Sequence, residues 1–261
     1  MNLISIGGFI LAVAVLFTGL RLTTDNLKIY FDYEALFIVI GGTLASTAIS
    51  VQLNKVGGLI KVFIKRILID KKIRYDQVIK EMMRICEAYR NGESLDTQIP
   101  KVTDDFLKEA LELIRDEIMD IEETFDVLQQ RIENMHFNYV EEASKMRSLG
   151  KYPPSYGIMG TTIGMIVLLG NLGGSDAIKK VGPAMSIAMI ATMYGIVLAN
   201  MALIPIGENL TNSSKETFLK NQLILEGLRL IVQKSNPIIV AEKLNSFLTP
   251  KERLNWKEVV K

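Results

Sequence analysis

Two segments of this sequence decide its fold: Pro153–Ser175, PPSYGIMGTTIGMIVLLGNLGGS, and Val181–Gly207, VGPAMSIAMIATMYGIVLANMALIPIG. Neither contains Asp, Glu, Lys, Arg or His, and each is long enough to cross a hydrocarbon core of about 30 Å as a helix. Asn2–Leu20 and Ala35–Leu53 are uncharged in the same way. A charge at the centre of a span costs roughly 3 kcal/mol on insertion scales, so these four segments are predicted to be transmembrane helices.

The composition separates in the same way along the chain. Hydrophobic residues make up 49% of it and charged residues 23%, and the two classes lie in alternating blocks rather than interleaved. The predicted fold class is therefore all-α: an integral membrane protein with four transmembrane helices and a helical cytoplasmic domain. No Lys or Arg precedes Arg21, so we interpret the first segment as a retained helix rather than a cleaved signal peptide.

Lys and Arg near the span ends predict the orientation. Seven of them follow the second span and three precede the third: Lys55, Lys61, Lys65, Arg66, Lys71, Lys72 and Arg74, then Lys145, Arg147 and Lys151. We therefore expect both termini to be cytoplasmic. Residues 1–53 would hold the first two spans with a short outward loop, 54–152 a cytoplasmic helical domain, 153–207 the last two spans, and 208–261 cytoplasmic C-terminal helices.

Periodicity and helix signals place the cytoplasmic helices. Apolar residues recur at helical spacing from Val78 to Tyr89, before Asn91-Gly92, and again from Phe106 to Ile118. Asp120-Ile121-Glu122-Glu123 resembles a capping box and predicts a helix that continues to Gly150. Thr249-Pro250-Lys251-Glu252 predicts the start of a terminal helix.

The residues that enzymes and metal sites use are scarce. His136 is the only histidine and Cys86 the only cysteine, and the chain has neither a Walker-type phosphate loop nor metal-ligand spacing. The net charge of +1 offers no bulk attraction for nucleic acid. We predict that the protein is not an enzyme, needs no cofactor or metal, and does not bind nucleic acid.

The interiors of the predicted spans contain several hydroxyl side chains. Thr161 and Thr162 lie in the third span, and Thr192 and Tyr194 in the fourth. Hydroxyls in a span most often bond to their own helix, but this cluster leaves room for a polar path. A carrier of protons or sodium ordinarily needs an intramembrane carboxylate, and these spans have none. If ions cross here, another chain must supply the acid.

Several motifs in order resemble the MotA/PomA family of flagellar motor stator A subunits. Gly157–Met165 resembles the family's third transmembrane helix, Val181–Ala188 with Thr192–Gly195 its fourth, and Ile38–Leu44 its second. The cytoplasmic pattern from Asp105 to Asp116 is similar as well. At the C-terminus, the matching segments are Asn236-Pro237 and Lys243–Leu248.

The resemblance implies an inner-membrane motor. The family forms a homo-pentamer around a dimer of a B subunit, which supplies the intramembrane Asp, and ion flow drives torque on the rotor switch protein. Pro154 and Pro205 match the family's two functionally sensitive prolines, and Thr161 and Thr192 match positions that line its ion path.

The resemblance also implies two rotor contacts and a transported ion. Arg90 and Asp96 match the charged cytoplasmic contact motif, although Tyr89 replaces its first Arg and the spacing is one residue shorter. Proton-driven members tend to carry Ala-Thr where this chain has Ala191-Thr192, which favours protons. Thr161 is more familiar from sodium-driven members, so sodium stays the alternative.

Two other functions compete with this one. A TolQ/ExbB-like energy-coupling subunit would have three spans, with one before the main cytoplasmic domain, whereas two precede it here. A membrane scaffold that conducts no ions would also explain packed hydroxyls. Motility after deletion separates a stator from the first alternative, and ion flux separates it from the second.

Overall fold

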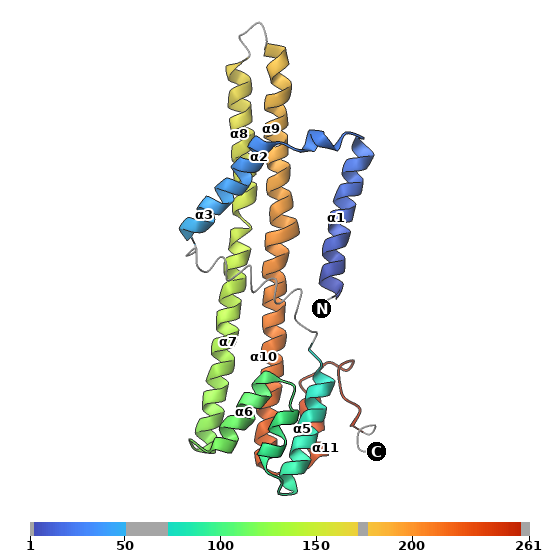
Figure 1. Ribbon diagram of the computed structural model, residues 1–261, viewed down its shortest axis with the longest axis vertical. Coiled ribbons are helices and arrows are strands. Elements are labelled where there is room, and N and C mark those ends of the chain that lie inside the picture. Colours follow the sequence, from blue (N-terminus) through green and yellow to red (C-terminus); the bar gives the residue numbers. More distant parts are fainter. Residues whose placement is uncertain (1–2, 51–72, 172–176, 257–261) are drawn as a thin grey trace. The chain divides into compact units, whose positions relative to one another are not determined.

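The computed structural model describes residues 3–50, 73–171 and 177–256, and every regular element in these ranges is helical (Figure 1). The predicted all-α class is therefore confirmed for the part of the chain that is described. The chain divides into two compact units, residues 1–71 with 140–212 and residues 72–139 with 213–261. Two long helices, α7 (Ile121–Leu149) and α10 (Ile204–Val232), contribute residues to both units.

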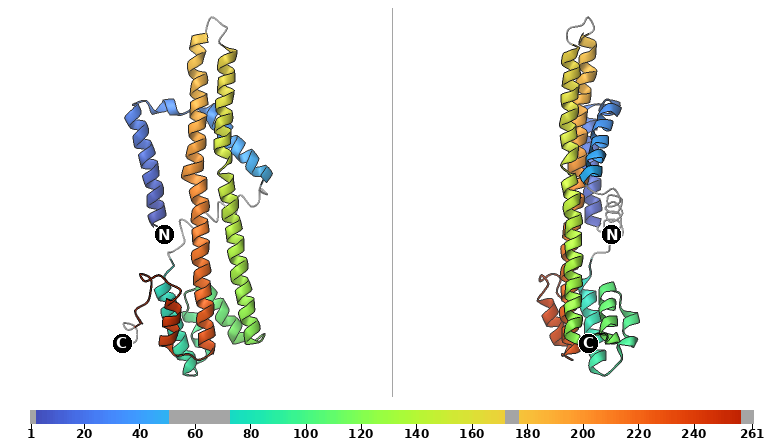
Figure 2. Two further views of the ribbon diagram at one scale, coloured as in Figure 1. Left: turned by 180° about the vertical axis from the view of Figure 1, so that it is seen from behind. Right: turned by 90° about the vertical axis from the view of Figure 1, so that its left-hand side faces the viewer.

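The first unit is built on an antiparallel helix pair. Helix α8 (Tyr152–Gly170) lies beside α9 (Ala177–Leu198) along its length, as both views in Figure 2 show. The other elements of this unit are α1 (Leu3–Thr23), η1 (Leu27–Tyr30), α2 (Tyr33–Leu36), η2 (Phe37–Gly41), α3 (Gly42–Ser50) and η6 (Ala199–Leu203). Of these, α2, η2 and α3 pack against the α8–α9 pair.

Small residues bring α8 and α9 into close contact. A Cβ atom added at Gly157 would lie 3.0 Å from the carbonyl oxygen of Ala191, and one added at Gly164 would lie 2.8 Å from that of Ala184. In a membrane the lipid tails are as apolar as the helix side chains, so helices associate through close packing rather than through the hydrophobic effect. The glycines of the third predicted span therefore form a seam with α9.

A tyrosine attaches α3 to the same pair. A Cβ atom at Gly42 would lie 2.1 Å from Cδ1 of Tyr156, so the ring covers the backbone of α3 directly. Ser46 Oγ and Tyr156 OH are 2.7 Å apart and share a hydrogen bond. A side chain larger than glycine at residue 42 would displace the ring.

The apolar surface is that of a membrane protein. Two described helical segments are long and apolar enough to cross a membrane, Leu27–Ser50 and Val181–Val232, and a shorter apolar helix covers Gly7–Thr23. Large apolar side chains on α8, including Ile158, Ile166 and Leu169, are exposed. Exposed apolar surface of this kind marks contact with lipid or with a partner. The count of four spans stays a prediction.

The second unit has its own hydrophobic core. It combines α5 (Tyr75–Arg90), η4 (Leu95–Thr97), η5 (Ile99–Lys101), α6 (Asp105–Asp116) and α11 (Pro237–Asn245) with parts of α7 and α10. Met82, Leu128, Leu223 and Leu244 are fully buried within it. The three helices expected from periodicity and capping signals are present as α5, α6 and α7.

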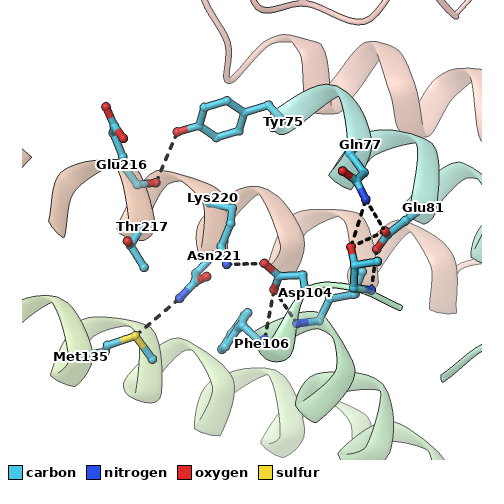
Figure 3. Close-up of polar contacts among 12 residues, drawn as sticks. Tyr75, Gln77, Glu81, Asp104, Phe106, Met135, Glu216, Thr217, Lys220 and Asn221 are labelled. Carbon is cyan, nitrogen blue, oxygen red and sulfur yellow. Dashed lines mark hydrogen bonds and ion pairs between the residues drawn. The ribbon is translucent and has the colours of Figure 1, made fainter. Parts of the chain in front are cut away.

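An ion pair joins α6 to α10 in this unit (Figure 3). Lys220 of α10 contacts Asp104, and their side chains are only 15% and 13% exposed. Asp104 also caps α6, because its Oδ1 accepts from the backbone N–H groups of Phe106 and Leu107 at 3.0 Å each. Removing one partner of such a buried pair typically costs about 3 kcal/mol or more.

A second polar contact in the same region joins α5 to α10. Tyr75 OH donates to the carbonyl oxygen of Glu216 at 3.3 Å (Figure 3). Burial, helped by the nearby carboxylates of Glu216 and Glu252, raises the pKa of Tyr75 to about 12. The phenol therefore stays protonated and remains a donor near neutral pH.

The terminal helix predicted from Thr249-Pro250-Lys251-Glu252 is not formed. Helix α11 ends at Asn245, and residues 250–252 make a turn in which Thr249 Oγ1 donates to Glu252 Oε2 at 2.9 Å. Asn245 explains the difference. Its side chain accepts from Leu254 N–H at 2.8 Å and donates to the carbonyl oxygen of Leu254 at 2.9 Å, which takes both backbone groups out of a helix. The rest of the expected helix, past Trp256, lies outside the described residues.

Candidate functional site

Two threonine hydroxyls meet at the seam between α8 and α9. Thr161 Oγ1 and Thr192 Oγ1 are in hydrogen-bond contact, and both side chains are half-buried. Thr161 Oγ1 also lies 2.9 Å from the carbonyl oxygen of Ala188 and 3.1 Å from that of Gly157. Thr192 Oγ1 lies 3.3 Å and 3.4 Å from the same two carbonyls. We call these four oxygen atoms the hydroxyl site.

Local helix geometry produces this cluster. Thr161 follows Gly157 by four residues on α8, and Thr192 follows Ala188 by four on α9, so each hydroxyl reaches the carbonyl one turn earlier. The missing side chain at Gly157 then lets the two helices approach until each hydroxyl also reaches the other helix's carbonyl. Thr162 shows the contrast: it is exposed and bonds only to Ile158 of its own helix, at 3.0 Å.

The hydroxyl site has more acceptors than donors. Each threonine hydroxyl carries one proton and two lone pairs, and each carbonyl oxygen carries two lone pairs. One hydroxyl donates to the other, and the remaining proton goes to one of the carbonyls. The site therefore keeps unused lone pairs. Unused lone pairs can bind a positively charged species. This can be a protonated water, which donates hydrogen bonds, or a metal cation that exchanges its water for oxygen ligands.

Pro154 lies one helical turn from the hydroxyl site on α8. A Cβ atom at Gly195 would lie 2.4 Å from the carbonyl oxygen of Pro153 and 3.1 Å from Cα of Pro154. Gly195 in turn follows Thr192 by three residues on α9. The structure therefore brings Pro154, Thr161 and Thr192 to the same seam, with Gly195 as the contact that holds the proline segment against α9.

Pro205 lies elsewhere, at the start of α10. It follows the π-helical segment η6, where Ile204 N–H donates to the carbonyl oxygen of Ala199. Proline has no N–H to donate, so a helix that contains one must rearrange its hydrogen bonds nearby. A wider π turn is one such rearrangement. Pro205 is exposed and is not part of the hydroxyl site.

Tyr194 does not join the polar path suggested by its position in the fourth span. Its hydroxyl donates to the carbonyl oxygen of Tyr30 at 2.7 Å and accepts from Asp32 N–H at 3.2 Å. Asp32 caps α2 by accepting from Ala35 N–H at 2.8 Å. Tyr194 therefore holds the segment before α2 against α9, which the sequence alone could not indicate.

The two residues expected to contact the rotor lie in the second unit. Arg90 is the exposed last residue of α5, and Asp96 lies in η4. Asp96 is not an isolated charge, because its Oδ1 lies 3.4 Å from Nη1 of Arg115. Arg115 is bound more closely by Asp116, at 2.7 Å. Sequence reasoning missed Arg115, since it is nineteen residues from Asp96 and only the turn between the helices brings them together.

The fold and the site together define a class: an all-helical membrane protein in which two apolar helices enclose a cluster of polar oxygens. Comparison with known proteins is consistent with this class. Residues 98–223 match the MotA/TolQ/ExbB proton channel family. The chain is 29% identical to Motility protein A of Borreliella burgdorferi, over 97% of this chain and 96% of that protein. It is 24% identical to chemotaxis protein PomA of Vibrio alginolyticus, over 95% and 94%.

A solved structure of C. jejuni MotAB has the same fold, with a TM-score of 0.85 at 23% identity over 96% of this chain and 97% of that one. These matches, two of them along nearly the whole chain, support the MotA/PomA family of membrane-embedded stator subunits. The resemblance seen in the sequence motifs is therefore confirmed. These relatives match nearly end to end and are motility and chemotaxis proteins, which argues against the TolQ/ExbB-like alternative.

Proposed function

We propose that this chain is the A subunit of an ion-driven flagellar stator, which forms an ion channel with a B subunit and converts ion flux into torque on the rotor. The hydroxyl site is the observation that supports this most directly. It places four oxygen atoms between two apolar helices, α8 and α9, that contain no acidic residue. Polar groups at such a position mark ion pathways in membrane proteins.

The missing carboxylate defines the partner. An ion path through the hydroxyl site needs a group that binds and releases the ion, and an Asp on the single span of a B subunit would supply it. The membership of the family supports a homo-pentamer of this chain around two such B chains. The exposed apolar face of α8 would then contact lipid, the B helix or a neighbouring copy.

The orientation follows from the distribution of Lys and Arg. Seven of these residues between Lys55 and Arg74, and three between Lys145 and Lys151, support a cytoplasmic location for residues 54–152 and for both termini. The chain would lie in the bacterial inner membrane as a four-span protein. In this arrangement Arg90 and Asp96 face the rotor switch protein from the cytoplasmic side.

Protons are the proposed ion. Ala191 precedes Thr192 in this chain, and this pair resembles that of proton-driven members. Ala191 is fully buried against Gly160 of α8, so no third hydroxyl adds to the site at this position. A cation such as sodium needs about six oxygen ligands, by analogy with other hard cations, whereas a proton relay needs only a hydrogen-bonded chain.

Three measurements test the proposed function. Deletion of the chain should stop swimming, and co-expression with its B subunit should raise the ion permeability of the membrane. Rotation should persist without sodium and stop when the proton gradient is collapsed. Rotation that requires sodium would overturn the choice of ion and give Thr161 the greater weight. A chain that supports normal assembly but no ion flux would be a scaffold.

We expect charge reversal at the two rotor-contact residues to uncouple the motor. Arg90→Glu and Asp96→Lys should each reduce swimming several-fold while ion flux and assembly stay unchanged. Exposed charges guide a partner to the surface and fix its position there, and they contribute little to folding. The loss should change with ionic strength. Motility in soft agar and ion flux in the same cells provide the measurement.

Two controls separate the rotor contact from the internal ion pair. Asp96→Asn removes the negative charge that lies 3.4 Å from Arg115 but does not reverse it, so it should be milder than Asp96→Lys. Glu133→Lys reverses an exposed charge elsewhere in the same unit and should swim normally. Wild-type motility of both Arg90→Glu and Asp96→Lys would exclude these positions as contacts.

A further inference from the structure

The fourth predicted span contains a carboxamide that the hydroxyl site does not use. Asn200 lies in η6, and its side chain is exposed. It is the only carboxamide between Val181 and Gly207, a segment without any charged side chain. A carboxamide is costly to place in hydrocarbon, so a membrane helix keeps one where it meets a polar partner or water. Asn200 therefore marks a polar point on the surface of this span.

The side chain of Asn200 leaves its oxygen available. Its Nδ2 donates to the carbonyl oxygen of Ile196, four residues earlier, at 3.1 Å. That is the one hydrogen bond of this side chain within the described part of the chain, and it does not involve Oδ1. A carboxamide oxygen carries two lone pairs. Oδ1 can therefore accept from a molecule outside this subunit.

The backbone carbonyl of the same residue also lacks its helical donor. In an α-helix the N–H four residues later would donate to it, and in a π-helix the N–H five residues later. The N–H of Ile204 donates instead to the carbonyl oxygen of Ala199. Residue 205 is a proline, which has no N–H. The π turn and Pro205 together leave the carbonyl oxygen of Asn200 without either of these donors.

Asn200 lies further along the fourth span than the hydroxyl site. It follows Thr192 by eight residues, which is about 12 Å at the rise of a helix. In the proposed orientation this span runs toward the cytoplasm, so Asn200 is on the cytoplasmic side of Thr192. Met189 and Ile196, which are 69% and 49% exposed, precede it at helical spacing and share its face of the helix. Asn200 therefore lies on a surface that lipid, water or the B subunit covers.

Two acceptors on one residue suit a cation better than a partner's side chain. Backbone that is not hydrogen-bonded within its helix occurs at membrane depth only where protein covers it or where it lines a water-filled path. The broken helices of transporters use such carbonyl oxygens to bind the transported ion. Helix–helix contacts, by contrast, are built from small residues and single side-chain hydrogen bonds. The combination of Oδ1 with an unbonded carbonyl therefore favours an ion path.

We propose that Oδ1 and the backbone carbonyl oxygen of Asn200 form a second oxygen site of the ion path, on the cytoplasmic side of the hydroxyl site. It binds the transported cation with its water after the cation leaves Thr192, and Pro205 creates it by removing a backbone donor. The proposal rests on the proposed function, because it needs an ion that crosses the membrane beside α9. It also gives Pro205, which lies outside the hydroxyl site, a role in the same path.

Asn200→Leu tests the second oxygen site in the complex with the B subunit. Leucine is similar in size and apolar, so it removes Oδ1 without placing a new polar group in hydrocarbon. Ion flux on co-expression with the B subunit should fall about tenfold, which corresponds to a barrier raised by about 1.4 kcal/mol. Copurification of the B subunit and the Tm of the complex should stay at the wild-type level. Asn200→Gln, which restores a carboxamide, should recover most of the flux.

The matched control is Asn212→Leu, the same replacement at an exposed asparagine of α10 beyond the predicted span. It should conduct and assemble normally. Wild-type flux of Asn200→Leu would overturn the second oxygen site. A loss of flux together with loss of the B subunit or a lower Tm would overturn it too, since Asn200 would then be a helix contact. Absence of flux in the wild-type complex would instead refute the proposed function.

Pro205→Ala gives a separate measurement of the backbone carbonyl. Alanine restores an N–H at residue 205, which can donate to the carbonyl oxygen of Asn200 and so occupy it. Flux should fall several-fold. When Asn200→Leu and Pro205→Ala are combined, flux should stay within about twofold of the lower single variant, because substitutions that act on one site are not additive. Two losses that multiply in the double variant would indicate separate sites and overturn the proposal.

Discussion

Gly195→Ala is expected to disrupt the pairing of α8 with α9 and to abolish motility. The added Cβ would lie 2.4 Å from the carbonyl oxygen of Pro153, 3.0 Å from its carbonyl carbon and 3.1 Å from Cα of Pro154. All three are backbone atoms, so no change of side-chain rotamer relieves the contact. Overpacking of a close-packed interior typically costs about 1–3 kcal/mol, and a clash with backbone belongs at the upper end.

Thermal unfolding of the purified stator complex provides the measurement. A loss of about 3 kcal/mol should lower Tm by roughly 5 °C or more in a chain of this size. Gly182→Ala is the matched control on the same helix, because no atom lies within 4 Å of its added Cβ. It should retain wild-type Tm and motility. If Gly195→Ala also does so, the α8–α9 contact at Pro153 is not required.

Thr192→Val should reduce ion flux about tenfold while leaving the fold intact. Valine keeps the shape of threonine and removes the hydroxyl that meets Thr161. Thr161 keeps two acceptors, Ala188 O at 2.9 Å and Gly157 O at 3.1 Å, so no proton is left unpaired. Interhelical hydrogen bonds in membranes contribute about 0.6 kcal/mol on average, which predicts a small loss of stability. A barrier raised by about 1.4 kcal/mol slows flux tenfold.

Two further variants decide what the hydroxyl does. Thr192→Ser retains the oxygen and should conduct within about twofold of wild type, a change of about 0.4 kcal/mol in the barrier. Thr162→Val removes the neighbouring exposed hydroxyl, which bonds only to Ile158, and should conduct normally. If Thr192→Val conducts as well as Thr192→Ser, then Thr192 is a packing residue that bonds its own helix.

Much of the architecture follows from local properties of the sequence. The free energy of inserting a helix depends on the residues within one segment, and the ends of a helix depend on the few residues that cap it. Accordingly, α5 ends at Arg90, just before the Asn91-Gly92 signal, with Gly92 at φ 85°. Likewise α7 extends from Ile121 to Leu149, as the absence of Pro and Gly predicted.

Local signals were wrong where a distant residue competed for the same backbone groups. Thr249-Pro250-Lys251-Glu252 has the composition of a helix start, yet Asn245 binds both backbone polar groups of Leu254. Similarly, Tyr194 reads as one more hydroxyl of the fourth span, but its partners are Tyr30 and Asp32 on a different segment. No pattern in the neighbouring residues indicates that Asn245 bonds to Leu254 or that Tyr194 bonds to Tyr30 and Asp32.

The sequence by itself indicated an all-helical membrane protein similar to the stator subunits, with no acidic residue in its four predicted spans. Only the tertiary structure decided which groups meet: Thr161 with Thr192, Gly195 with Pro153, and Asp96 with Arg115. The physical reason is range. Hydrophobicity and capping act within a few residues, whereas hydrogen bonds and close contacts depend on positioning separate helices to within a fraction of an ångström.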